Sequence, residues 1–145
     1  MRTLNIALMV LRAGVLIELV LGILFWTNVI NPDTSKLVLV HILIGLIVVV
    51  SLWIIGLAQG FIRASNNFGL ALLTFVVGLV VALFGLLQTR MIPDSSAHWV
   101  IQVIHLALGL LAIATGEMVA AVTKRRVRAA KADTTLRPSP TTTSR

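Results

Sequence analysis

The sequence predicts an all-α protein, a transmembrane four-helix up-down-up-down bundle built from two helix-loop-helix repeats. Composition is the first observation behind this prediction: the 145 residues are 58% hydrophobic and 12% charged, with a mean hydropathy of +1.02, far outside the range of soluble domains. The second is that four apolar stretches each reach the length of roughly 20 helical residues that crosses a hydrocarbon core of about 30 Å.

We expect these transmembrane helices over residues 10–30, 37–58, 68–88 and 99–123. The short segments between them favour antiparallel neighbours. Residues before Arg12 either extend the first helix or lie along the membrane interface, and we expect them to be retained because no small-residue cleavage site follows. Residues 1–123 form the predicted bundle, and residues 124–145 a basic, disordered cytoplasmic tail.

Basic residues set the expected orientation. A basic cluster follows the fourth stretch at residues 124–131, whereas the two loops on the opposite side hold only Lys36 and Arg90. By the positive-inside rule both termini face the cytoplasm, and we expect an integral protein of a bacterial inner (plasma) membrane. Because the net charge of +7 lies largely in the tail, the expected partner is the lipid bilayer and not nucleic acid.

The second and fourth apolar stretches share a pattern, a histidine followed four residues later by glycine and then leucine. The two copies read His41-Ile-Leu-Ile-Gly45-Leu46 and His105-Leu-Ala-Leu-Gly109-Leu110. An ionisable residue inside a membrane is a functional-site hypothesis by default. At a rise of about 1.5 Å per residue, both histidines lie within roughly 10 Å of the outer ends of their helices, so we expect the two imidazoles to be level.

In such a bundle the second and fourth helices lie diagonally across the centre, with axes on the order of 12 to 14 Å apart. That distance keeps two imidazoles from touching but suits a haem iron between them, which makes His41 and His105 the predicted metal ligands of a haem b. Gly45 and Gly109 lie on the same faces as the histidines, where a bare backbone lets the macrocycle pass close. A bare metal ion is disfavoured because two histidines leave its coordination shell incomplete.

Two further residues on the face of His105 are candidates for cofactor binding. Gln102 is placed to orient His105 or to bond a haem propionate, and an interhelical hydrogen bond is the competing interpretation. His98 lies at the water boundary, where a solvated loop side chain is the simplest reading and a propionate contact or a proton path the functional ones.

Glu18 and Glu117 are the acidic residues within the apolar stretches. Both are expected toward the cytoplasmic half, distant from the proposed haem. A buried carboxylate needs a partner or a proton, so a pair with Arg12 or Arg63 is the simplest expectation, and proton uptake is the alternative.

A four-helix unit with histidines on its second and fourth helices near the outer face resembles one half of a haem A synthase and, more loosely, a small membrane b-type cytochrome. The segment Gln102-Val-Ile-His105-Leu-Ala-Leu-Gly109 is closest in character. Haem A synthases carry a glutamate three residues before the first histidine, where this chain has Val38, and many have an outer-loop cysteine pair, whereas this chain has no cysteine. The resemblance therefore implies haem binding without haem modification.

The function expected from the sequence is a membrane b-type haem protein with bis-histidine ligation that transfers electrons, as a subunit or partner of a respiratory complex. Six-coordinate iron suits electron transfer better than oxygen binding. No nucleophile–base pair, phosphate-binding loop or carboxylate dyad is evident, so an electron carrier is favoured over a catalyst. Two alternatives stay open: a haem-free four-helix scaffold or accessory subunit whose histidines only pack, and a small transporter, which the two-fold repeat and the membrane acids motivate.

Overall fold

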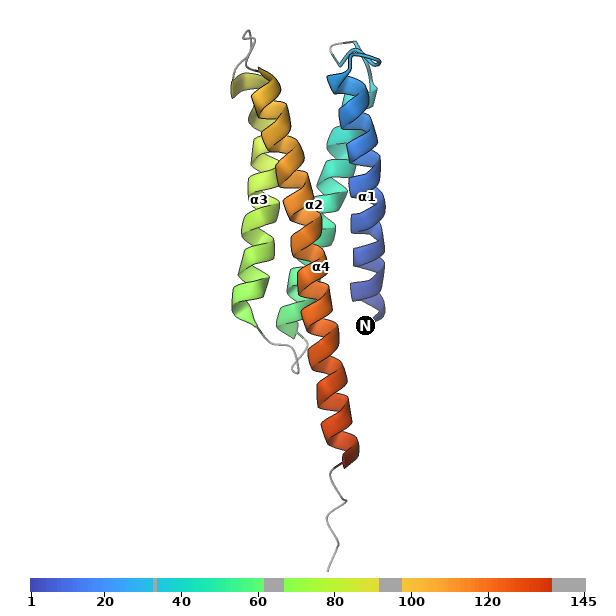
Figure 1. The fold of residues 1–145 in the computed structure, drawn as a ribbon, viewed down its shortest axis with the longest axis vertical. Helices are drawn as coiled ribbons and strands as arrows, with labels where there is room; N and C mark the ends of the chain where they lie inside the picture. Colours follow the sequence, from blue (N-terminus) through green and yellow to red (C-terminus); the bar gives the residue numbers. More distant parts are fainter. Residues whose placement is uncertain (33, 62–66, 92–97, 137–145) are drawn as a thin grey trace, which may run out of the picture.

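The computed structural model is an all-α bundle, as the sequence predicts (Figure 1). It describes residues 1–32, 34–61, 67–91 and 98–136. All four helices are long and apolar enough to cross a membrane, which is the architecture of an integral membrane protein. The helices are α1 (Arg2–Trp26), α2 (Leu37–Phe61), α3 (Phe68–Met91) and α4 (His98–Leu136).

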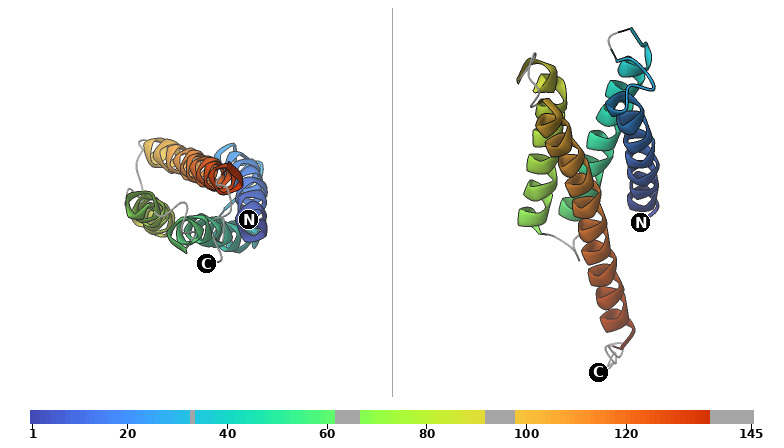
Figure 2. Two further views of the ribbon diagram at one scale, coloured as in Figure 1. Left: turned by 90° about the horizontal axis from the view of Figure 1, so that it is seen from below. Right: turned by 45° about the horizontal axis from the view of Figure 1, so that its top comes forward.

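The helices run up, down, up and down around the bundle axis, and each contacts its neighbours in the chain (Figures 1 and 2). The α2 and α4 helices also contact each other across the centre, whereas α1 and α3 make no contact among the described residues. The predicted diagonal placement of α2 and α4 is therefore confirmed. The N-terminus and the long C-terminal part of α4 lie at one end, and the α1–α2 loop lies at the other.

The first helix differs from its predicted range of 10–30. It begins at Arg2, so the residues before Arg12 extend the helix, and Leu4 and Leu8 pack into the core, 1% and 4% exposed. It ends at Trp26, and Asn28 then adopts a left-handed conformation with φ of 55°, which asparagine tolerates better than most residues. The helix is therefore shifted toward the N-terminus relative to the prediction, and this shift changes the depth of every side chain it carries.

The starts of α2 and α3 follow capping side chains. The Ser35 Oγ accepts a hydrogen bond of 3.1 Å from the Leu37 N–H, and the Asn67 Oδ1 accepts one of 3.2 Å from the Leu70 N–H. Such oxygens satisfy N–H groups that have no partner in the first turn of a helix. The predicted starts of these helices, residues 37 and 68, are confirmed.

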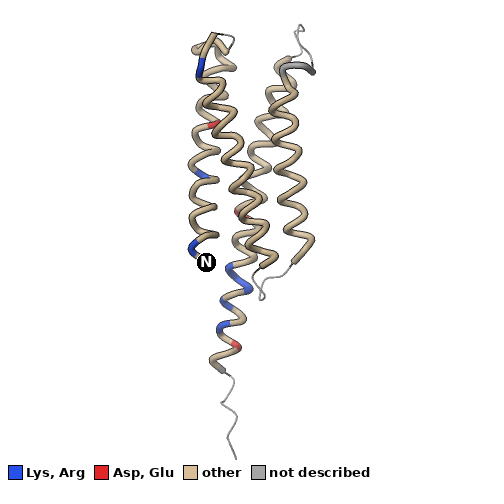
Figure 3. Tube along the Cα trace, turned by 180° about the vertical axis from the view of Figure 1, so that it is seen from behind, with Lys and Arg blue, Asp and Glu red and all other residues tan. Residues whose placement is uncertain are grey.

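The last helix corrects the expectation of a disordered tail from residue 124. It continues to Leu136 as an exposed single helix that projects beyond the bundle (Figures 1 and 3). Alanine, arginine and lysine, which are strong helix formers, dominate residues 124–132, and no proline lies between His98 and Pro138. Residues 137–145 lie outside the described part of the chain.

The tightly packed core lies in the half of the bundle near the N-terminus. Its buried polar residues include Gln59 and Thr123, both fully buried, and the Thr123 hydroxyl donates to the Gln59 Oε1. The apolar members include Leu4, Leu8 and Leu11 of α1, Val48, Leu52 and Ile55 of α2, Val77 of α3, and Ala112, Val119 and Ala120 of α4.

The two repeats are matched along the line where α2 faces α4, which we call the α2–α4 seam. Starting from each histidine, the residues at offsets of 4, 7, 11, 14 and 18 share its helix face, the alternating spacing of helices packed side by side. The first members, His41 and His105, face each other, and the last members, Gln59 and Thr123, are hydrogen-bonded. The positions that share these faces are 41, 45, 48, 52, 55 and 59 on α2 and 105, 109, 112, 116, 119 and 123 on α4.

Candidate functional site

The imidazoles of His41 and His105 meet at the loop end of the α2–α4 seam. Their ring centroids are 6.1 Å apart, and the ring planes are inclined by 61°. The prediction that the two side chains point at each other across the bundle is confirmed. The expected separation of about 12 to 14 Å between the diagonal axes is too large, because α2 and α4 pack in contact.

Each histidine also packs against a phenylalanine from the preceding helix. Phe25 of α1 lies edge-on to His41, with centroids 5.7 Å apart, and Phe84 of α3 stacks on His105, with centroids 6.2 Å apart and planes inclined by 12°. The repeat therefore includes an aromatic neighbour for each imidazole. The sequence analysis missed both, although each phenylalanine lies near the end of the helix that precedes a histidine.

Glu18 is the acidic residue of the site. Its Oε2 lies 2.7 Å from the Nδ1 of His41, and each side chain is only 17% exposed. The expectation that Glu18 lies distant from the histidines and pairs with an arginine is therefore wrong. The physical reason is the shift of α1: because this helix ends at Trp26, Glu18 is about 12 Å from its loop end at 1.5 Å per residue, close to the depth of His41.

The other membrane acid has the partner that the sequence analysis proposed. Arg12 donates through Nε to the Glu117 Oε1 and through Nη2 to the Glu117 Oε2, the latter over 2.9 Å. This bidentate pair joins α1 to α4 in the half of the bundle away from the histidines. Arg63, the alternative partner, lies outside the described residues.

Three buried polar atoms of the site have no hydrogen-bond partner among the described residues: His41 Nδ1, His105 Nδ1 and Glu18 Oε1. For His41 the 2.7 Å separation from Glu18 is an electrostatic contact, but the angles depart from those of a hydrogen bond. A buried polar atom without a partner costs about 1 to 3 kcal/mol. Three of them in one place point to a functional site more than to a packed core.

Packing around the histidines is looser than in the core. Apart from Ile101, the buried apolar residues lie in the other half of the bundle, and the α1–α2 and α3–α4 pairs diverge toward the histidine end (Figures 1 and 2). A Cβ atom added at Gly22 or Gly109 would meet nothing within 4 Å. The histidine end therefore has fewer buried apolar side chains than the core.

The glycines of the site have different neighbours. A Cβ at Gly45 would lie 3.7 Å from the Glu18 Oε2, so this position faces the carboxylate. A Cβ at Gly85 of α3 would lie 3.1 Å from the Cε1 of His105, a contact tighter than ordinary packing. Gly85 is thus a site residue that the duplicated pattern did not reveal, because it lies on a helix without a histidine.

The remaining candidates lie near the start of α4. His98 is the first residue of this helix and Gln102 lies one turn further on, both half-buried. Lys36 is exposed at the same end of the bundle, and the side chain of Arg90 lies outside the described part. Cofactor binding by His98 and Gln102 stays a prediction.

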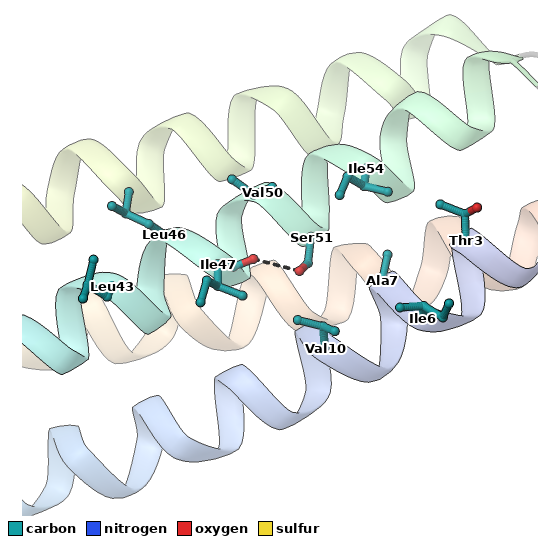
Figure 4. Close-up of a pocket in the computed structure, with 10 residues that line it drawn as sticks. All are labelled: Thr3, Ile6, Ala7, Val10, Leu43, Leu46, Ile47, Val50, Ser51 and Ile54. Atoms are coloured by element: carbon teal, nitrogen blue, oxygen red, sulfur yellow. Dashed lines mark hydrogen bonds between the residues drawn. The ribbon is translucent and has the colours of Figure 1, made fainter.

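An apolar groove runs along α1 and α2 on the outside of the bundle (Figure 4). Ile6, Leu43 and Leu46, which line it, are 61%, 51% and 43% exposed. Of its polar lining residues, Thr3 and Ser51, the latter donates a hydrogen bond of 2.7 Å to the Ile47 carbonyl within the same helix. The other lining residues are apolar, so the groove offers mainly hydrocarbon contact to lipid.

The geometry of the histidine pair can be compared with that of a bis-imidazole iron. With metal–nitrogen bonds of about 2 Å and ring nitrogens about 1 Å from the ring centres, the two centroids come to about 6 Å apart. His41 and His105, at 6.1 Å, fit this spacing. The described residues contain no group of three or more metal-binding side chains, whereas a porphyrin supplies four ligands of its own.

Comparisons of the chain with protein-family models, curated proteins and solved structures found no match. The class of protein is therefore described from its fold and site alone: it is a four-helix membrane-type bundle with a histidine pair facing across the α2–α4 seam.

Proposed function

We propose that this protein binds one b-type haem between His41 and His105 and transfers electrons in the membrane, as a subunit or partner of a respiratory or quinone-linked complex. The observation that carries the proposal is the pair of facing imidazoles, whose centroid distance of 6.1 Å fits an iron between them. The Nδ1 of His105 supports it, because a buried ring nitrogen without a hydrogen-bond partner among the described residues is suited to a further partner.

The residues around the histidines have separate roles in this proposal. The haem, when bound, would supply one-electron chemistry. His41 and His105 would hold it, and Phe25 and Phe84 would fix the ring orientations and keep water from the imidazoles. Gly85 lets His105 lie against α3. The loose packing at this end of the bundle supports the presence of a bulky group.

The orientation with both termini in the cytoplasm of a bacterial cell is part of the proposal. Its support is that the basic residues of the α4 extension gather at the same end of the bundle as Arg2 (Figure 3). The chain has no cysteine, so single cysteines introduced at Thr27 and Asp133 can be labelled on intact cells with a membrane-impermeant maleimide. Labelling at Thr27 alone is expected, and labelling at Asp133 alone would reverse the orientation.

A haem-free scaffold is the second candidate, and a specific contact favours it. The Glu18 carboxylate and the His41 imidazole lie within 2.7 Å of each other without any ligand. A polar contact of this kind between two helices, together with the stacking of Phe84 on His105, can join helices by itself.

Absorbance of the purified protein separates the two functions. After expression with a haem supply, the Soret absorbance per protein is measured for the wild type and for His41→Ala, His105→Ala and His98→Ala. We expect a reducible Soret band in the wild type, a strong loss in the first two variants, and little change in the third. Wild-type spectra in both His41→Ala and His105→Ala would exclude bis-histidine ligation, and a colourless wild type that takes up no added haemin would favour the scaffold.

A further inference from the structure

The two histidines are matched in the repeat, but their polar surroundings differ. His41 has the Glu18 carboxylate 2.7 Å from its Nδ1. On the side of His105, α3 places the bare backbone of Gly85 and the ring of Phe84. The two-fold symmetry of the α2–α4 seam is therefore broken by one acidic side chain.

We propose that Glu18 is a positioning residue that orients the His41 imidazole through Nδ1 and makes the two axial ligands unequal, with His41 the stronger electron donor to iron. This inference rests on the proposed function, since a donor strength requires a bound iron. The contact between Glu18 and His41 is independent of it and has its own test.

Burial makes the contact significant. The side chains of Glu18 and His41 are each only 17% exposed, so both are largely buried in the bundle. A carboxylate inside an apolar helix bundle is costly without a polar partner. Arg12, the basic residue nearest to Glu18 in α1, is engaged by Glu117. The imidazole of His41 is therefore the partner that the fold provides for Glu18.

Gly45 is what allows the carboxylate to reach this position. A Cβ at Gly45 would lie 3.7 Å from the Glu18 Oε2 and 4.0 Å from its Cδ, which is ordinary contact, whereas a longer side chain would occupy the place of the carboxylate. Gly109, at the matched position of the second repeat, has no such neighbour within 4 Å. The shared histidine–glycine spacing thus meets a neighbouring side chain in the first repeat and open space in the second.

The expected effect on a bound haem follows from electrostatics. A carboxylate beside the second nitrogen of a metal-bound histidine fixes the ring orientation and raises the basicity of the ligand. Its negative charge also favours the ferric over the ferrous state, because the oxidised iron carries one more positive charge. Glu18 should therefore lower the reduction potential of the haem.

The test compares Glu18→Gln with Glu117→Gln, a matched variant of the other membrane glutamate. Both replacements keep the shape of the side chain and remove its charge. The first readout needs no haem: nitrogen NMR spectra of the protein with labelled histidine in lipid nanodiscs. We expect Glu18→Gln to shift the His41 ring signals and leave those of His105 nearly unchanged, and Glu117→Gln to shift neither. Glu18→Asp, which keeps the charge, is the second variant if Glu18→Gln does not fold.

The second readout uses the haem-loaded protein. We expect Glu18→Gln to weaken haem binding by about 10- to 100-fold, as loss of a histidine-orienting carboxylate does in metal sites, and to raise the reduction potential. Each tenfold loss of preference for the ferric state corresponds to about 59 mV. Glu117→Gln should keep the wild-type potential.

These outcomes separate a failure of the Glu18 inference from a failure of the proposed function. Unchanged His41 ring signals in Glu18→Gln would overturn the inference whether or not haem binds. A shift of these signals in a wild type that binds no haem would support the Glu18 contact and refute the proposed function. Shifted signals with an unchanged potential would overturn the claim of unequal ligands.

Discussion

Replacing Gly85 with alanine tests whether α3 holds His105 in place. The added Cβ would lie 3.1 Å from the His105 Cε1, about half an ångström inside the optimum of about 3.5 to 4.0 Å between carbon atoms. His105 cannot simply move away, because Phe84 stacks on its ring and His41 faces it. The matched control is Gly109→Ala on α4, where the new methyl group meets nothing within 4 Å.

The expected magnitudes follow from two opposing effects. Alanine is favoured over glycine in a helix by about 0.8 to 1 kcal/mol, and this gain applies to both variants. Overpacking costs about 1 to 3 kcal/mol, and it applies only at Gly85. We therefore expect Gly109→Ala to stabilise the bundle by about 1 kcal/mol and Gly85→Ala to lower its unfolding free energy by about 0 to 2 kcal/mol.

Unfolding by sodium dodecyl sulfate in bicelles, followed by helical circular dichroism, measures both free energies. The nitrogen NMR signals of the His105 ring should also shift in Gly85→Ala and stay unchanged in Gly109→Ala. Equal unfolding free energies of the two variants, together with an unmoved His105 signal in both, would refute the packing of His105 against α3.

Three further predictions concern other parts of the bundle. Gln59→Leu or Thr123→Val alone should destabilise the bundle by about 0.5 to 1.5 kcal/mol because each removes the hydrogen bond that joins α2 to α4, and the double variant should lose little more than either single variant; additive losses in the same unfolding assay would contradict this. Arg12→Ala should lower the unfolding midpoint, and the exchanged pair Arg12→Glu with Glu117→Arg should restore it. An unchanged midpoint in Arg12→Ala would show that the ion pair does not stabilise the bundle. Neutralising the basic residues of 124–131 should weaken binding to anionic vesicles by about 1 kcal/mol per charge near the surface while circular dichroism still shows a folded bundle; equal retention on neutral and anionic vesicles would count against this role.

Much of the fold could be predicted from local patterns. The starts of α2 and α3 are marked by Ser35 and Asn67, short polar residues that cap helices, and the lengths of the apolar stretches determine how many helices cross the membrane. The duplicated histidine pattern placed His41 and His105 at one depth on diagonal helices, and the structure brings their rings together. These predictions succeed because spacing along a helix translates directly into height and face.

The sequence by itself determined the membrane class, the bundle topology and the meeting of the two histidines, since each follows from hydropathy and helical periodicity. Only the tertiary structure decided which side chains surround them. Nothing in the α1 sequence fixes its depth in the membrane, because mostly apolar residues run from Leu4 to Trp26. The packing of α1 against the core places Glu18 at the level of His41. Likewise, no spacing rule links Gly85 to His105. Contacts between helices depend on how far each helix slides and rotates against its neighbours, and these two quantities are set by the packing of the whole bundle.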